Sequence, residues 1–227
     1  MGDLQPQPPR GPDRPQGQGF LLEDLGLRNY DEVYHYQLEL VGRLKHAHLS
    51  LDRLLFVEHN DIYTLGRRSS QAETDQAFPT ISIERGGQIT FHNPGQLVCY
   101  PILRLREKEK DLHKYLRRLE QLLIDVLSDF GLKGERRPGA TGVWIEGREK
   151  KIASIGVAVS SWVTYHGTAL NISNDLSGFA KIRPCGFPSE VMTSMAVELR
   201  DACPSISEVK ESYVHHFGRI FQRTLAI

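Results

Sequence analysis

A cysteine in an irregular segment is the strongest candidate in this sequence for covalent chemistry. Cys185 stands in the stretch KIRPCGFPSE between a proline and a glycine, which hold the backbone in a tight turn. A cysteine attacks a substrate as a thiolate, so it needs a nearby cation, base or helix N-terminus. A short helix predicted after Pro188 and Ser189 could direct its free N–H groups toward the thiol. The alternative is a buried structural cysteine.

Two adjacent lysines could supply a proton acceptor. Lys150 and Lys151 lead into the strand-like stretch IASIGVAV. Because successive strand residues point to opposite faces, Lys151 shares a face with Ala153 and Ile155, whereas Lys150 points the other way. Desolvation of an inward lysine favours the neutral amine, which suits proton transfer. The alternative is a pair of solvated charges at the end of a hairpin.

Histidines beside glycines indicate a pocket wall. In ERGGQITFHNPGQ, Arg85 precedes two glycines that let the backbone approach a ligand closely, and His92 ends a strand beside a rigid turn. His166 stands next to Gly167 in the same way. Two such histidines favour a cleft over the alternative, a plain hairpin with an ordinary histidine.

Other polar motifs carry weaker signals. His46 and His48 have the spacing of two metal ligands, but no third ligand is evident, so we expect no metal site. The arginines of the GRR motif at 66–68 could bind a phosphate or a carboxylate, although a solvated pair after a strand is the default reading.

Composition limits the class of protein. The 227 residues include 28 Lys and Arg and 28 Asp and Glu, a balance that gives no reason to expect nucleic acid or a membrane as partner. No apolar run approaches the roughly 20 residues that span a bilayer, and no secretion signal is visible. Three cysteines without framework spacing suit a reducing compartment, so we expect a cytoplasmic protein.

The pattern of elements predicts a single α+β domain over residues 21–227 after a disordered Pro- and Gln-rich tail over 1–20. Asn93 to Gln96 match a type II turn in which Gly95 takes the positive φ. Helices are predicted over 27–45, 111–130 and 205–225, and strands over 53–59, 141–146, 151–159 and 162–173, the last three antiparallel. The stretch 80–105 reads as two further strands around the glycine and proline turn.

Taken together, the motifs resemble those of the lipoyl(octanoyl) transferases over about 24–199. VEHNDIYTLGRR is similar to the family's EH-x-x-x-[YF]-T-x-G-[RK]-R strand, and RGGQITFHNPGQLVCYPIL to its RGG-x-x-T-[YF]-HGPGQ-L-x-x-YP signature. GVWI followed by KIASIG, and HGTALNISNDLSGFAKIRPCGF, resemble the remaining blocks in the same order. The resemblance implies the biotin/lipoate ligase-like fold, a mixed or antiparallel central sheet flanked by helices.

The resemblance also implies roles for individual residues. Cys185 occupies the position of the acyl-accepting cysteine and Lys151 that of its partner lysine, while Thr193 and Ser194 match a Thr-Ser pair that gives local support. The residues implied to bind substrate are Arg85, Gly86, Gly87, Gln88, Ile89, Thr90, Phe91, His92, Ser154, Ile155, Gly156, His166, Gly167, Thr168 and Ala169.

The implied reaction takes an octanoyl group from acyl carrier protein, through a thioester on Cys185, to a lysine of a lipoyl domain. It is the first step of lipoate biosynthesis, and its protein partners are acyl carrier protein, the E2 subunits of 2-oxoacid dehydrogenases and the glycine cleavage H protein. No metal, ATP or other cofactor is implied, because the substrate travels on the phosphopantetheine arm of the carrier protein.

The chain departs from the family pattern mainly at Asn93, where the family usually has glycine, and in PSEVMTSM, which lacks the usual glycine spacing. We expect these changes to affect the pocket rim and fine specificity. Three alternatives remain open from the sequence: an ATP-dependent ligase of the same fold, a binding module that holds acylated carrier protein or lipoyl domains without turnover, and a structural domain without a site.

Overall fold

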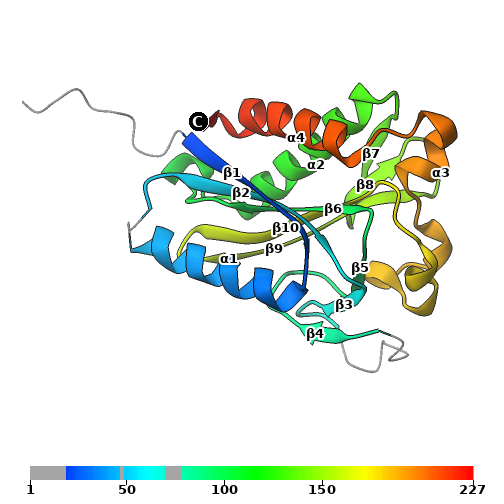
Figure 1. Ribbon diagram of the computed structural model, residues 1–227, viewed down its shortest axis with the longest axis horizontal. Coiled ribbons are helices and arrows are strands. Elements are labelled where there is room, and N and C mark those ends of the chain that lie inside the picture. The colour runs from blue at the N-terminus through cyan, green and yellow to red at the C-terminus, as the bar shows by residue number, and fades with distance from the viewer. Residues whose placement is uncertain (1–18, 47–48, 70–77, 227) are drawn as a thin grey trace, which may run out of the picture.

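The computed structural model describes residues 19–46, 49–69 and 78–226, and its core is a mixed sheet of eight strands (Figure 1). The strand order is β11-β1-β2-β6-β10-β9-β8-β7. β1 pairs in parallel with β2 and β11, and every other pair is antiparallel. The strands are β1 Gly19–Arg28, β2 Asp52–His59, β6 Gln96–Ile102, β7 Gly134–Arg137, β8 Ala140–Ile145, β9 Lys151–Ser160, β10 Val163–Asn171 and β11 Thr224–Leu225.

A smaller sheet of three strands, β4 Thr80–Ser82, β3 Ile62–Leu65 and β5 Thr90–His92, lies beside the large one. The chain crosses from β5 to β6 through the predicted type II turn, in which the Gln96 N–H donates to Asn93 O at 3.2 Å and Gly95 has φ +87°. A Cβ on Gly95 would lie 2.7 Å from Asn174 N. This turn therefore connects two sheets rather than the two strands of a hairpin.

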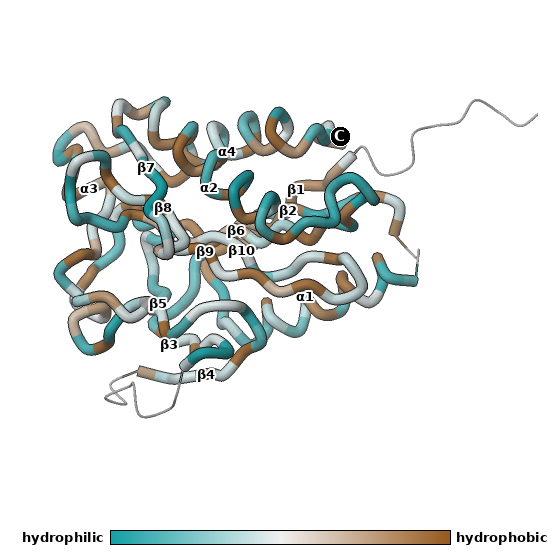
Figure 2. The backbone as a smooth tube through the Cα atoms, turned by 180° about the vertical axis from the view of Figure 1, so that it is seen from behind, coloured by the Kyte–Doolittle hydropathy of each residue, from teal (hydrophilic) through white to brown (hydrophobic). Residues whose placement is uncertain are grey.

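Helices cover both faces of the large sheet (Figure 1). α2 Leu112–Asp129 and α4 Ile206–Phe221 pack on one face, and α1 Tyr30–Lys45 packs on the other. Figure 2 shows hydrophobic and hydrophilic segments alternating along α2 and α4, as expected for helices with one buried face. The shorter helices are α3 Met195–Leu199 and the 3-10 turns η2 Glu107–Glu109, η3 Ser177–Lys181, η4 Pro184–Gly186, η5 Ser189–Val191 and η6 Arg200–Ala202.

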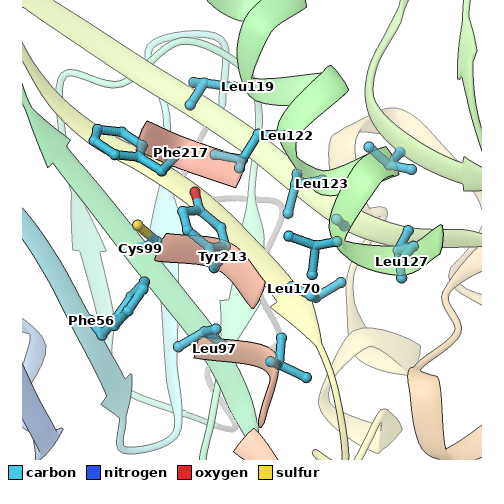
Figure 3. Packing of buried hydrophobic residues seen from close by; sticks show 14 of the residues in the cluster. Phe56, Leu97, Cys99, Leu119, Leu122, Leu123, Leu127, Leu170, Tyr213 and Phe217 are labelled. Atoms are coloured by element: carbon cyan, nitrogen blue, oxygen red, sulfur yellow. The ribbon is translucent and has the colours of Figure 1, made fainter. Parts of the chain in front are cut away.

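The largest core cluster joins α2 and α4 to the sheet. Figure 3 shows Leu119, Leu122 and Leu123 of α2 facing side chains of α4 and of the central strands. Cys99 is fully buried in this cluster, as the sequence predicts for a small core residue. This cluster packs α2 and α4 against one face of the large sheet.

Helix ends agree with the capping residues in the sequence. Asp111 accepts a hydrogen bond from Lys114 N at 3.0 Å, and Gly131 follows the end of α2 with φ +78°. Ser205 and Glu208 form the predicted capping box of α4. The three helix predictions and the four strand predictions are confirmed, with ends shifted by a few residues.

The N-terminal boundary differs from the prediction. Residues 1–18 of the predicted tail lie outside the described residues, but Gly19 and Phe20 already belong to β1, and Phe20 is fully buried against Phe217. The prediction also lacks a strand over β1. Its register with β2 shifts between Asp24 and Leu27, and its alternation is irregular, so the sequence carries no strand pattern there.

Candidate functional site

A pocket of about 400 Å³ lies beside the start of β9. Its walls come from the segments after β3 and before β5, from the first turns of α2, from the start of β8 and from the segment after η4. The lining residues are Arg67, Arg68, Gly86, Gly87, Leu112, Leu116, Gly139, Ala140, Thr141, Lys151, Ile155, Gly156, Val157 and Phe187. The pocket therefore combines apolar walls with three basic side chains.

Lys151 is fully buried at this pocket, on the inward face that strand alternation predicts. Its Nζ atom has no hydrogen-bond partner among the described residues. The atom lies 5.7 Å from the centroid of the Trp144 ring and 6.0 Å from that of Phe187. Gly142 makes room for this side chain, since a Cβ there would lie 2.7 Å from Lys151 Cε. Lys150 points away and donates to Glu190 O at 2.6 Å.

Cys185 lies in η4, and residues that follow it in the chain contact Lys151. Phe187, two residues later, contacts the lysine amine as described above. Further along, Met192 forms a parallel bridge with Lys151, and the Thr193 N–H donates to Lys151 O at 3.0 Å. Gly186 takes φ +83°, and a Cβ there would lie 2.7 Å from Gln88 Oε1. The fold thus brings the residues that follow Cys185 against the start of β9.

The predicted helix after Ser189 is wrong at that position. Only the 3-10 turn η5 follows Pro188, and Met192 returns to an extended conformation so that it can pair with Lys151. A regular helix, α3, begins only at Met195, with Ser194 as its N-cap. A helix N-terminus aimed at Cys185 is therefore not part of the site.

Thr193 has the supporting role that was expected of it. Its hydroxyl donates to Glu198 Oε1 at 2.6 Å, and its carbonyl accepts from Asn171 Nδ2 at 2.9 Å. With the bond to Lys151 O, these contacts fix the segment after Cys185 to both β9 and β10.

Arg85 braces the glycine-rich wall. Its guanidinium donates to Thr64 O at 2.6 Å, to Thr64 Oγ1 at 2.8 Å and to Gln88 O at 2.7 Å. Gly86 N donates to Val157 O at 3.0 Å, which joins this wall to β9. The arginine that the motif places among the substrate-binding residues is thus mostly engaged with the protein's own oxygens.

A second cavity of about 40 Å³ adjoins the pocket and shares Gly86, Gly87, Ile155 and Gly156 with it. Its other lining residues are Tyr30, Arg85, Thr90, His92, Val98, Tyr100, Ser154, His166, Gly167, Thr168 and Ala169. Every residue expected to bind substrate lines one of the two cavities except Gln88, Ile89 and Phe91. Gln88 lies against Gly186, whereas Ile89 and Phe91 are buried in the hydrophobic cluster beside the small sheet.

The histidines at the second cavity are held neutral. Burial lowers the pKa of His92 and that of His166 to about 3, and Arg85 nearby adds to both shifts. His92 Nδ1 pairs with Gln96 Oε1 at 2.7 Å. Both ring nitrogens of His166 lack a partner among the described residues, and its φ of +55° is unusual for a non-glycine residue. Neither ring is in the imidazolium form near pH 7, so neither can act as a general acid there.

Several pocket residues escape sequence reasoning. Arg67 and Arg68 are both exposed, as in the default reading of a solvated pair, and they line the pocket together with Leu112 and Leu116 of α2. The helical pattern places Leu112 on the apolar face of α2, but it does not show that this side chain, which is 41% exposed, lines a pocket.

Neither a metal site nor a membrane span is found within the ranges that the structure describes. No group of three or more His, Cys, Asp or Glu residues there could hold a metal ion; His46 belongs to these residues, and His48 lies outside them. No helix in the same ranges is long and apolar enough to cross a bilayer.

Comparisons with known proteins agree on one family. The family model of the lipoyl protein ligase A/B catalytic domain matches residues 29–218. The octanoyltransferase of Syntrophotalea carbinolica is 44% identical over 207 residues, which cover 91% of this chain and 96% of that protein. The octanoyltransferase of Thermosynechococcus vestitus is 42% identical over 204 residues, which cover 87% of this chain and 88% of the relative.

Solved structures share the fold at low sequence identity. A bipartite lipoate protein ligase from Thermoplasma acidophilum superposes with a TM-score of 0.68 at 16% identity, covering 92% of this chain and 88% of that one. A biotin protein ligase from Aquifex aeolicus, in complex with biotin and ATP, gives a TM-score of 0.54 at 13% identity, with 90% and 71% covered. These likenesses support the predicted fold class.

Proposed function

The chain belongs to the octanoyltransferases of the lipoyl protein ligase A/B catalytic domain family, and we propose that it moves an octanoyl group from octanoyl-acyl carrier protein to a lipoyl-domain lysine through Cys185. Such an enzyme is an acyltransferase in lipoate biosynthesis. The acceptors proposed are the lipoyl domains of 2-oxoacid dehydrogenase E2 subunits and the glycine cleavage H protein.

One observation carries the proposal. A buried lysine amine without a hydrogen-bond partner among the described residues lies beside the backbone segment that bears Cys185, at a pocket of about 400 Å³ with apolar walls. An unpartnered buried amine costs folding free energy, so its presence calls for an explanation. Deprotonation of a thiol, next to a pocket that can hold a flexible acyl donor, would explain it.

In the first half-reaction Lys151 accepts the thiol proton, and the Cys185 sulfur attacks the thioester carbonyl of the donor. The carbon–sulfur bond to the carrier arm breaks, and the departing thiolate takes the proton back. In the second, the acceptor amine loses a proton to Lys151 and attacks the thioester on Cys185, which leaves as a thiol. An amide replaces a thioester, so neither ATP nor a metal enters this scheme.

Intact-protein mass spectrometry tests the scheme. Mixing with octanoyl-acyl carrier protein, without acceptor, should add one octanoyl group that hydroxylamine removes. Cys185→Ala should abolish the adduct, whereas the matched control Cys203→Ala, a half-buried cysteine away from the pocket, should keep it. Absence of any adduct on the folded wild-type protein, or octanoylation of a lipoyl domain that requires free octanoate and ATP, would contradict the proposal.

A further inference from the structure

The ionisable side chains at the pocket are all basic. Among the described residues that line it, these are Lys151, Arg67 and Arg68, and none is acidic. The chain as a whole has no net charge, so this is a local feature. Lys151 is fully buried, whereas both arginines are exposed, which places the lysine at the inner end of the pocket and the arginines at its mouth.

The backbone under the two arginines is fixed to the glycine-rich wall. Arg67 N donates to Arg85 O and Arg68 N donates to Gly87 O, both at 3.1 Å. Gly66 packs so closely there that a Cβ would lie 2.5 Å from Gly87 O. The arginines therefore keep their place at the rim because the chain beneath them is part of the wall.

Their guanidinium groups are available to a ligand. Neither forms an ion pair with a residue in the described ranges, in contrast to Arg53, which pairs with Glu23, and Arg223, which pairs with Asp52. Arginine forks match the oxygens of a phosphate group and hold them with charge-assisted hydrogen bonds. An anion at the pocket mouth would meet two such forks.

We propose that Arg67 and Arg68 bind the phosphodiester of the acyl donor's 4′-phosphopantetheine arm, while the thioester lies farther in, at Lys151 and the segment of Cys185. This inference rests on the proposed function and adds a subsite to it. Apolar side chains such as Leu112, Leu116 and Ile155 line the space between the two ends and suit an uncharged arm. The arginines are positioning residues that do not touch the reacting atoms.

Two small donors isolate the phosphate from all contacts with a carrier protein: octanoyl-pantetheine, and the same thioester with a 4′-phosphate. Formation of the acyl-enzyme is followed by mass spectrometry over a range of donor concentrations. For the wild-type protein we expect the phosphate to lower the half-saturating concentration about tenfold, with little change in the maximal rate. Arg67→Gln and Arg68→Gln should each remove much of that difference, and the lysine variants should restore part of it.

A matched control is Arg28→Gln. Arg28 lies in β1 away from the pocket, and its guanidinium donates to its neighbour Leu27 O, so the preference for phosphate should persist. Equal half-saturation for both donors, with acyl-enzyme formed from each, would overturn the phosphate subsite and leave the proposed function standing. The phosphate subsite would also be overturned if the glutamine variants bound both small donors equally less well, or if they bound only the whole carrier protein less well. Failure of either donor to acylate Cys185, when octanoyl-acyl carrier protein also fails, would remove the proposed function itself and this inference with it.

Discussion

Lys151 Nζ lies 5.7 Å from the centroid of the Trp144 ring, and the same ring has the Arg137 guanidinium carbon 4.5 Å from its centroid. Trp144 is 1% exposed, and its Nε1–H donates to Ala140 O at 3.3 Å. Phe187 packs its ring edge to face against it, with centroids 5.1 Å apart. The rings of Trp144 and Phe187 thus flank the Lys151 amine, and no carboxylate of the described residues forms an ion pair with it.

Trp144→Leu should slow formation of the acyl-enzyme. The ring positions the Lys151 amine that accepts the thiol proton, and displacement of that amine should slow acylation by about tenfold. Trp144→Phe keeps a ring face and should retain more of the rate than the leucine variant does at equal stability. The rate of acylation and the free energy of unfolding are measured for both. If the two variants lose rate only in proportion to their stability, Trp144 has no role beyond packing.

Gly142→Ala should remove both stability and activity. Gly142 has φ +126°, and a Cβ there would lie 2.4 Å from Ala153 O and 2.7 Å from Lys151 Cε. Steric strain of this kind costs about 1–3 kcal/mol, and the lysine stem must also shift. Gly147→Ala is the matched control, because Gly147 has φ +69° with nothing within 4 Å of the added Cβ. Urea unfolding and acylation rates should show strain in both variants and loss of acylation only in the first.

Stability should fall on mild acidification. Burial lowers the pKa of His92 and that of His166 to about 3, and that of His59 to about 4, whereas unfolded histidine titrates near 6.5. Below pH 6.5 the unfolded chain therefore binds protons that the folded chain does not, so the stabilisation present above pH 6.5 is lost as pH falls toward 4. Each histidine contributes up to about 1.4 kcal/mol per pH unit in this range.

Urea unfolding at pH 7.5, 6.5, 5.5 and 4.5 measures that slope. His166→Asn removes one of the three groups, and asparagine tolerates the left-handed φ of +55° at this position. The variant should lose free energy of unfolding less steeply below pH 6.5 than the wild-type protein does. An identical slope in both would show that His166 does not take part.

Asn93→Gly, which restores the residue usual in the family, should destabilise this protein. Asn93 Nδ2 donates to Asp175 O at 2.9 Å, and its Oδ1 accepts from Asn174 Nδ2 at 3.0 Å. The backbone of Asn93 does not take a positive φ, so glycine brings no relief of strain. Loss of one buried and one partly buried hydrogen bond costs about 1–3 kcal/mol.

Hydrogen exchange and urea unfolding test this change at Asn93. Exchange should accelerate over 174–182, the segment that leads to Cys185, because its anchor on the turn is gone. The control Asn60→Gly removes one exposed bond, from Asn60 Nδ2 to Asn29 Oδ1, and should leave that segment protected. Unchanged protection in the Asn93 variant would mean that the amide contacts are not what holds the segment.

The sequence predicts those parts of the fold whose cause is local. Asp111, Gly131 and the Ser205–Glu208 pair mark helix ends through bonds within one turn, and the helical apolar pattern between them marks the buried face. β7, in contrast, reads GERR and pairs with β8 while it contacts α2. A strand that is stabilised mainly by pairing with its neighbour leaves no pattern in its own sequence.

The residues of the site also fall into those that local sequence predicts and those that depend on tertiary packing. Strand alternation is enough to turn Lys151 inward, and the motif matches name the glycine-rich walls. The function of Arg85 as a brace depends on Thr64, a residue of another strand, and the place of Arg67 and Arg68 at a pocket mouth depends on how that strand packs. Such relations arise only from the tertiary fold.

The bond from Thr193 N to Lys151 O has a consequence for how the protein matures. It closes a loop of about 40 residues that contains β9, β10 and the whole segment of Cys185. Closing a loop of this length costs entropy, which the chain recovers only when the strands between have paired. The contact between Lys151 and the segment after Cys185 therefore forms only when the strands between them have paired.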